Sequence, residues 1–170
     1  DAIAPETLLE ECNRFYDQYP HTDLVGGVQV TPEQDNYFAK LSGYALSSFF
    51  GAYKMSSRYN PKKINLNADE TVITSAIFSI KKEVFNTVGG FNPDLFPGED
   101  PEFFSRVKKE GFNIAYAPRI IVYHKRRPSL PLFFKQMYRY GKVRPRKEKI
   151  GKSSIPLVYL IPSFFLCYLL

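Results

Sequence analysis

Residues 75–100 of the 170-residue chain read SAIFSIKKEVFNTVGGFNPDLFPGED, and their pattern predicts several elements of secondary structure in order. It begins inside Thr71–Ile80, which is rich in β-branched and small residues and therefore favours a buried strand. Lys81–Val88 predicts a short helix that the pair Gly89-Gly90 stops. The loop Phe91–Glu99 is dense in Pro, Asn and Gly, and a compact domain usually keeps such a loop for a purpose.

A second helix is expected where this loop ends. Asp100, Pro101 and Glu102 supply an N-cap, a proline in the first helical position and an acid in the first turn. Apolar residues follow at positions that can form a buried face, and Gly111 ends the helix. The stretch therefore predicts a strand, a helix, a loop and a further helix in sequence.

The rest of the chain also alternates helices with strands. The Gly-Gly pair inside Leu24–Val30 indicates a strand with close backbone approach. Because strands alternate with helices, the fold class is α/β, with an incomplete sheet of about four strands. The remaining expected elements are helices over Pro5–Tyr19, Asp35–Tyr53 and Ser129–Tyr140, strands over Asn113–Tyr116 and Ile120–Tyr123, and a loop over Met55–Asp69.

The composition is that of an ordinary globular domain. Hydrophobic residues make up 44% of the chain and charged residues 24%, which excludes disorder over the whole length. The two cysteines, Cys12 and Cys167, can build neither a disulfide framework nor a cysteine metal site. A reduced, cytosol-facing location fits this cysteine content.

Most of the positive charge lies in one segment. The chain has a net charge of +6, and twelve of its 23 Lys and Arg residues lie between Arg119 and Lys152, with the single acid Glu148. The sixteen residues Ile155–Leu170 that follow carry no charge, whereas roughly 20 apolar residues are needed to cross a bilayer. The chain opens with Asp1 and ends within this apolar run, so we expect it to be a piece of a longer protein.

These observations divide the chain into three parts. Residues 1–127 form the globular part. Residues 128–152 are expected to form a basic amphipathic interfacial helix and linker, and residues 153–170 to begin a transmembrane or membrane-embedded segment. The positive charge that precedes this segment would face the cytoplasm, so the protein is expected to be membrane-associated with its globular part on that side.

The motifs between Thr74 and Tyr140 resemble, in order and spacing, the C-terminal half of a family 2 glycosyltransferase catalytic domain. This is the inverting type, with the nucleotide-diphospho-sugar transferase (GT-A) fold. The resemblance implies a nucleotide-diphospho-sugar donor and a glycan or lipid-linked acceptor, in cell-surface polysaccharide or glycolipid synthesis. It also implies that the donor-binding half is missing from this chain. The matching features are SAIFSIKKEVF, GGFNPDLF, GED before a helix, GFNIAYAP, a hydrophobic strand ending in Tyr123-His124, Arg127-Pro128-Ser129-Leu130, and Gln136-Met137-Tyr138-Arg139-Tyr140-Gly141.

The Gly98-Glu99-Asp100 turn resembles the family's catalytic loop. Inverting transfer needs a base within reach of the acceptor hydroxyl, and the resemblance assigns this role to Asp100. The alternative is that Asp100 is only an N-cap, and both roles can coexist because a cap position fixes the direction of the carboxylate. Glu99 is either an acceptor-binding partner or a solvated loop acid. Gly89, Gly90 and Gly98 provide backbone freedom and would let the acceptor approach the main chain.

The resemblance also implies a divalent metal, Mg or Mn. Asp1 would be the closing Asp of the family's Asp-x-Asp element. In some members a His at the place of His124 ligates the cation, and a neutral imidazole is a reasonable ligand. The alternative for His124 is a structural hydrogen bond at the end of a strand.

Gln136, Arg139 and Tyr140 are similar to the Gln-x-x-Arg-Trp motif of processive members, with Tyr in place of Trp. Their spacing puts all three on one helix face, where they could bind the diphosphate and the acceptor sugar. The alternative is an amphipathic helix on the membrane surface, with Lys135, Arg139 and Lys142 towards the headgroups.

Two other classes of protein compete with a transferase. One is a non-catalytic acceptor-binding or scaffold fragment. The other is a nucleic-acid-binding module, suggested by basic residues interleaved with Tyr and Phe. The uncharged run after the basic segment counts against nucleic acid as a partner.

Overall fold

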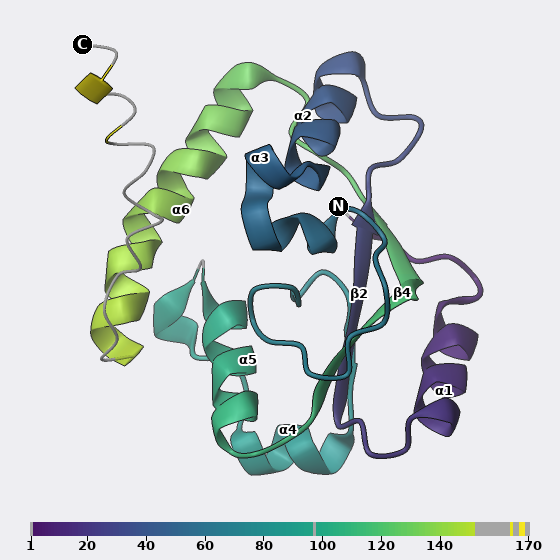
Figure 1. Ribbon diagram of the computed structural model, residues 1–170. Coiled ribbons are helices and arrows are strands. Elements are labelled where there is room, and N and C mark those ends of the chain that lie inside the picture. Colours follow the sequence, from purple (N-terminus) through teal and green to yellow (C-terminus); the bar gives the residue numbers. More distant parts are fainter. Residues whose placement is uncertain (1, 97, 152–163, 165–166, 169–170) are drawn as a thin grey trace.

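The computed structural model describes residues 2–96, 98–151, 164 and 167–168 (Figure 1). Within these residues a four-stranded sheet has the order β1-β4-β2-β3. Strands β2 and β4 are parallel, whereas β1 pairs antiparallel with β4 and β3 pairs antiparallel with β2. The expected α/β fold with a small sheet is thus confirmed. The strands are β1 (Ala2–Ile3), β2 (Leu24–Val30), β3 (Phe78–Ile80) and β4 (Ile114–His124).

The central pair of strands explains the Gly-Gly sequence in β2. The register between β2 and β4 shifts between Gly26 and Val28. At Gly27 an added Cβ would lie 2.0 Å from the carbonyl oxygen of Ile120, so only glycine lets the two backbones approach this closely. The two strands predicted over 113–116 and 120–123 are the two parts of β4 on either side of this irregularity, which contains Pro118.

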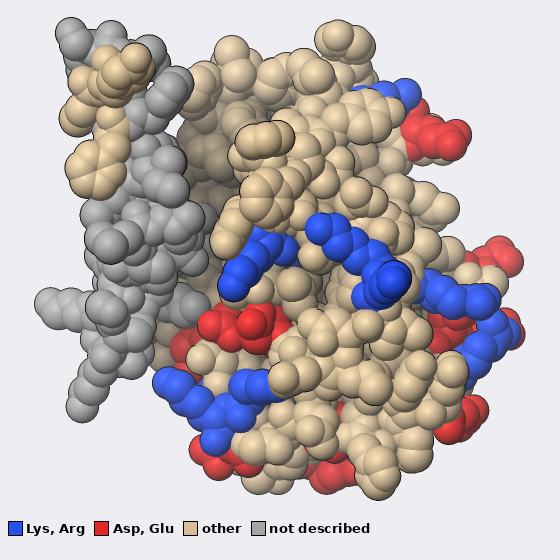
Figure 2. All heavy atoms as spheres, in the orientation of Figure 1, with Lys and Arg blue, Asp and Glu red and all other residues tan. Residues whose placement is uncertain are grey.

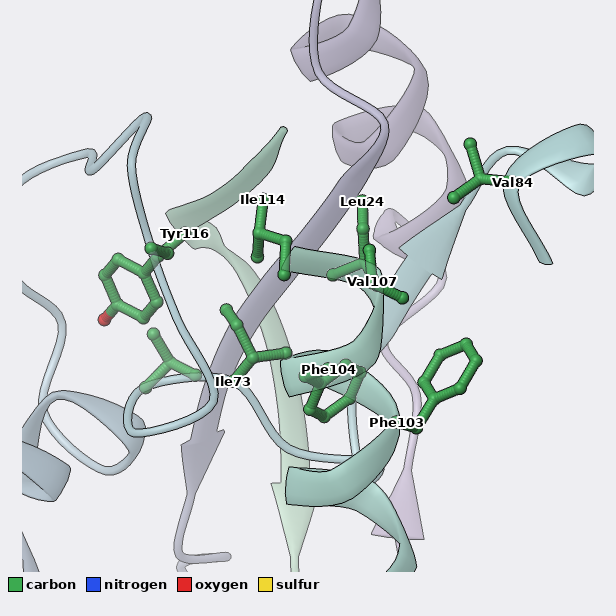
Figure 3. Packing of buried hydrophobic residues seen from close by; sticks show 10 residues of the cluster. Leu24, Ile73, Val84, Phe103, Phe104, Val107, Ile114 and Tyr116 are labelled. Carbon is green, nitrogen blue, oxygen red and sulfur yellow. The ribbon is translucent and has the colours of Figure 1, made fainter. Parts of the chain in front are cut away.

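The sheet separates two apolar clusters because successive side chains of a strand point to opposite faces. On one face, α1 (Leu8–Gln18) packs Cys12 and Phe15 near Val25. On the other face, α4 (Lys82–Val88) and α5 (Glu99–Lys109) pack against Leu24 and Val28. Figure 3 shows Phe103, Phe104 and Val107 of α5 on that second face. Helix α5 is thus packed against the sheet through these buried side chains.

The helix predicted over 35–53 is interrupted at Ser48. The structure has α2 (Tyr37–Ser47), the short α3 (Phe49–Ala52) and a 3₁₀ helix η1 (Tyr53–Arg58). Ser48 has extended φ and ψ angles of −82° and 151°, and its hydroxyl accepts a hydrogen bond from the amide of Gly51. The serine therefore ends one helix and caps the next, which periodicity alone does not reveal. The η1 helix also occupies part of the predicted loop over 55–69.

The strand predicted over 71–80 is correct only for its last three residues, which form β3. Its first residues are held by side chains instead of a neighbouring strand. The amide of Thr71 donates to Asp69 Oδ1 at 2.8 Å, and the carbonyl of Thr71 accepts from Arg58 Nε at 2.8 Å. These bonds use backbone groups that a longer strand would need for its ladder.

The C-terminal part of the described chain is dominated by α6 (Leu130–Gly151), which is longer than the helix predicted over 129–140. Its start is fastened to α2, since Asn36 Nδ2 donates to the carbonyl of Pro128 at 2.8 Å and the rings of Phe38 and Phe133 lie 6.4 Å apart. No helix in the described part of the chain is long and apolar enough to cross a membrane. The predicted membrane segment, 153–170, lies almost entirely outside the described residues.

Candidate functional site

The candidate site lies where the parallel strands β2 and β4 end side by side. Val30, the last residue of β2, pairs with Tyr123, and His124 follows as the last residue of β4. In α/β sheets, ligands bind beyond the carboxyl ends of the parallel strands. Residues that bind ligands are therefore expected beyond the carboxyl ends of β2 and β4.

Asp100 lies in the first turn of α5 but is not its N-cap. The cap is Gly98, with φ of 124°, and Glu99 is the first helical residue. The N-cap prediction is therefore wrong, because glycine can adopt this positive φ and lets the helix begin two residues earlier. Glu99 Oε2 accepts a hydrogen bond from the amide of Gly98 at 2.9 Å, so this acid provides a hydrogen-bond partner for the backbone amide of the N-cap residue.

The carboxylate of Asp100 is held by a residue from a distant segment. Asp100 Oδ2 accepts hydrogen bonds from the amide and the hydroxyl of Ser75, at 3.2 and 3.4 Å. Ser75 is exposed and Asp100 is half-buried, so the pair lies at the protein surface and not inside the core. The carboxylate is thus both oriented and accessible.

Burial raises the pKa of Asp100 above its ordinary value, and the nearby charge of Glu99 acts in the same direction. The amide of Ser75 and the charge of Arg58 oppose this rise in the pKa. A base works best when its pKa lies near the working pH, so a raised carboxylate pKa favours proton acceptance.

A chain of polar groups, with Gln29 and Thr74 buried, connects Ser75 with the segment that follows β4. Gln29, a buried residue of β2, donates through Nε2 to the hydroxyl of Thr74, which directly precedes Ser75. The guanidinium of Arg126 donates to the carbonyl of Gln29 at 2.9 Å and to its Oε1 at 3.4 Å. Arg126 therefore supports, through Gln29, the segment that orients Asp100.

Arg126 also ties together three other segments. Its Nε donates to the hydroxyl of Thr31 at 3.2 Å, its amide donates to Asp35 at 3.0 Å, and its guanidinium lies 4.6 Å from the ring centre of Tyr59. Burial lowers the pKa of Arg126, while the charges of Tyr59, Asp35 and Tyr140 oppose this lowering. Sequence reasoning missed Arg126 and Gln29. The available signal was a single Gln in the otherwise apolar run LVGGVQV.

His124 has the properties of a metal ligand at one ring nitrogen. Its Nδ1 is buried and has no hydrogen-bond partner among the described residues. Burial, followed by the charge of Arg126, lowers the pKa of His124 and so favours the neutral imidazole that ligates metals. Ala2 pairs with His124 in the sheet, whereas Asp1, the other predicted ligand, lies outside the described residues. The described residues contain no cluster of three potential metal-ligating side chains.

The predicted glycine pair has a visible structural function. Gly89 is the C-cap of α4 with φ of 81°. The carbonyls of Val88 and Gly90 accept hydrogen bonds from Arg106 at 2.7 and 2.9 Å, and Arg106 pairs with Glu102 at 2.8 Å. The pair thus fastens α4 to α5, and a role in binding substrate stays a prediction.

The three residues of the α6 motif lie as their spacing indicates. Gln136 Nε2 donates to the hydroxyl of Tyr140 at 2.9 Å, which places both side chains on one helix face. Arg139 is exposed. Tyr140 interacts electrostatically with Arg126. This face of α6 therefore lies near Arg126, whose hydrogen bonds lead through Gln29 to Thr74, the residue before Ser75. Their contact with substrate stays a prediction.

Comparison with protein families identifies the chain. The model of glycosyl transferase family group 2 matches residues 1–144. The chain therefore belongs to family 2 of the glycosyltransferases, and its reaction class is glycosyl transfer. Membership implies a nucleotide-sugar donor and an acceptor as partners. No curated protein and no solved structure matches the chain.

Proposed function

We propose that this chain carries the acceptor side of an inverting sugar transferase, with Asp100 as the general base. The Asp100 carboxylate accepts the proton of an acceptor hydroxyl. The oxygen of that hydroxyl forms a bond to the anomeric carbon of the donor sugar, while the bond from that carbon to the diphosphate breaks on the opposite face. The observation that carries this proposal is the accessible Asp100 carboxylate, which Ser75 orients and whose pKa burial raises.

The charge of the departing diphosphate needs a positive partner. The unpaired Nδ1 of His124 fits a divalent cation, Mg or Mn, with Asp1 as the second ligand that the family resemblance implies. When bound, the cation supplies positive charge to the leaving diphosphate. On α6, Gln136, Arg139 and Tyr140 bind the diphosphate or the acceptor, and Gly98, Glu99, Gly89 and Gly90 border the acceptor path.

The base is tested by Asp100→Asn in the complete protein. We expect transfer to fall by about 10²–10⁴-fold, the usual contribution of a positioned base, with no decrease in the thermal unfolding midpoint. Asp94→Asn is the matched control, because Asp94 is an exposed acid six residues before Asp100 in the chain. Transfer at the wild-type rate by Asp100→Asn would refute the assignment.

The donor half is proposed to come from chain outside the residues described here. In support, the described sheet has a single parallel pair of strands, β2 and β4, which is small for a complete nucleotide-binding sheet. The alternative of a non-catalytic acceptor-binding fragment is distinguished by nucleotide binding. A complete protein that binds no nucleotide diphosphate would favour the fragment, and salt-sensitive binding to oligonucleotides would favour a nucleic-acid module.

We also propose association with a membrane, with the catalytic part on the cytoplasmic side. The support is the charge pattern, in which a basic segment precedes the uncharged run Ile155–Leu170. Removal of residues 153–170 should release the protein from membranes in a sedimentation assay. A truncated protein that still sediments after a high-salt wash would contradict this anchor. A membrane site suits an acceptor used in cell-surface polysaccharide or glycolipid synthesis.

A further inference from the structure

A hollow lies between α3, η1 and the loop that follows. It has a volume of about 360 Å³ and is lined by Phe49, Tyr53, Lys54, Lys62 and Asp69, among others. We call it the η1 pocket. This volume lies in the range of small-molecule sites. Asp100 does not line it.

The η1 pocket carries an excess of positive charge. Lys54 and Lys62 line it and form no ion pair with another described residue. The one acid, Asp69, is engaged by Thr71, whose amide and hydroxyl both donate to Asp69 Oδ1. Figure 2 shows blue side chains gathered over this part of the surface. The pocket therefore suits an anion better than a neutral ligand.

One wall of the pocket is aromatic and strained. Tyr53 has φ of 49°, and it is the one non-glycine residue with positive φ in the described part of the chain. The rings of Phe49 and Tyr53 lie 5.1 Å apart, and Lys54 Nζ lies 6.0 Å from the ring centre of Tyr53. A bulky residue in this conformation costs energy and is found preferentially at ligand clamps. The pocket thus has an aromatic surface beside two lysines.

The pocket is connected to Asp100 through one backbone segment. Thr71 lines the pocket, and Ser75, four residues further on, binds Asp100. Four residues span at most about 14 Å. Arg58 binds the carbonyl of Thr71 and acts electrostatically on Asp100. One acceptor molecule can therefore reach both places.

We infer that the η1 pocket binds a phosphate group carried by the sugar acceptor. The phosphate lies between Lys54 and Lys62, and the neighbouring sugar ring packs against Tyr53 and Phe49. This inference rests on the proposed function only in calling the ligand an acceptor, because the binding itself does not depend on Asp100. The phosphate is either part of a free sugar phosphate or the link between a sugar and a lipid, and the chemistry of the contact is the same.

The test is calorimetric titration of the complete protein with glucose 1-phosphate. We expect Lys54→Gln and Lys62→Gln each to weaken binding by about tenfold, which is the loss of one charge-assisted hydrogen bond. Lys54→Arg should retain most of the affinity. Lys82→Gln, on the exposed surface of α4, is the matched control and should bind like the wild type. Thermal unfolding of each variant separates loss of binding from loss of folding.

Two results would overturn the inference. One is equal affinity for glucose 1-phosphate in the wild type and in the Lys54→Gln, Lys62→Gln double variant. The other is a wild type that binds glucose 1-phosphate no more tightly than glucose. Farnesyl phosphate forms a second arm of the experiment. Tighter, lysine-dependent binding of farnesyl phosphate assigns the phosphate to a lipid carrier, whereas tighter binding of glucose 1-phosphate assigns it to a sugar.

The inference and the proposed base fail separately. Asp100→Asn should lose transfer and keep its affinity for glucose 1-phosphate. If that variant retains both transfer and lysine-dependent binding, the base assignment fails and the pocket assignment stands. If it loses transfer while the double lysine variant binds normally, the pocket assignment fails alone.

Discussion

Replacement of Arg126 by Met should destabilise the fold and disorganise the site. Met keeps much of the apolar length of the side chain but removes the guanidinium. The hydrogen bonds to the carbonyl of Gln29 at 2.9 Å and to the hydroxyl of Thr31 at 3.2 Å are then lost. The cation–π contact with Tyr59, at 4.6 Å, is lost as well. Arg126→Met therefore removes the link between the segment after β4, strand β2 and the C-cap residue of η1.

The expected size of this effect follows from these contacts. A hydrogen bond to a charged group contributes about 1.5–3 kcal/mol, and a cation–π contact adds about 0.5–2 kcal/mol. Since the hydrogen bonds to Gln29 and Thr31 share one guanidinium and their contributions overlap, we expect a loss of about 3 kcal/mol. For a chain of this size such a loss lowers Tm by about 6–12 °C.

The matched control is Arg119→Met. Arg119 pairs with Glu11 at 3.0 Å, but its side chain is 71% exposed, and exposed ion pairs contribute only about 0–1 kcal/mol. Thermal unfolding of both variants gives the comparison. The reasoning is refuted if Arg126→Met lowers Tm no more than Arg119→Met does.

A kinetic measurement separates positioning from stability. At temperatures where Arg126→Met is folded, kcat should fall while KM for the donor changes little, because the network orients Ser75 and through it Asp100. Arg126→Lys keeps the charge but not the planar fork, so it should recover only part of kcat. An unchanged kcat in folded Arg126→Met would limit Arg126 to a structural role.

Three further outcomes are expected. Burial raises the pKa of Asp100 in the folded protein, so the free energy of unfolding decreases as the pH rises through that pKa and the carboxylate ionises. Asp100→Asn, which stays neutral, should therefore have a higher Tm than the wild type at pH 7. This difference in Tm should vanish below about pH 4, where the carboxyl group of Asp100 is protonated in the unfolded protein as well. Gly27→Ala should cost about 1–3 kcal/mol, since its Cβ would lie 2.0 Å from the carbonyl oxygen of Ile120; Gly141→Ala, with nothing within 4 Å, should leave Tm unchanged or raise it. His124→Ala should raise the Mn²⁺ concentration needed for half-maximal transfer, and an unaltered metal requirement would remove His124 from the proposed metal site.

The sequence predicted those elements whose local pattern also satisfies their backbone. The helix over Pro5–Tyr19 and the strand over Leu24–Val30 are found as α1 and β2. The errors occur where a side chain takes over backbone hydrogen bonds. Ser48 splits one predicted helix, and Asp69 with Arg58 shortens a predicted strand. Such substitutions depend on tertiary contacts, which a periodic pattern does not contain.

The candidate site was predicted in part for a related reason. Asp100 and His124 could be chosen because they belong to contiguous motifs. Gln29 and Arg126 could not, because 97 positions separate them in the chain and only the sheet brings them together. A buried Gln in a strand must find a partner, so the sequence indicated that a partner exists without indicating which residue it is.

The structure also changes how Asp100 is understood. With Gly98 as the cap, the carboxylate stands in the first helical turn, where the helix dipole stabilises its anion. The amide of Ser75 and the charge of Arg58 act in the same direction, and yet burial outweighs them and raises the pKa. The groups that favour the anion hold the carboxylate in one orientation, whereas burial favours the protonated form of the carboxyl group. Such a carboxylate can accept a proton without a change of position. An N-cap role would explain the orientation alone, whereas a general base requires both properties.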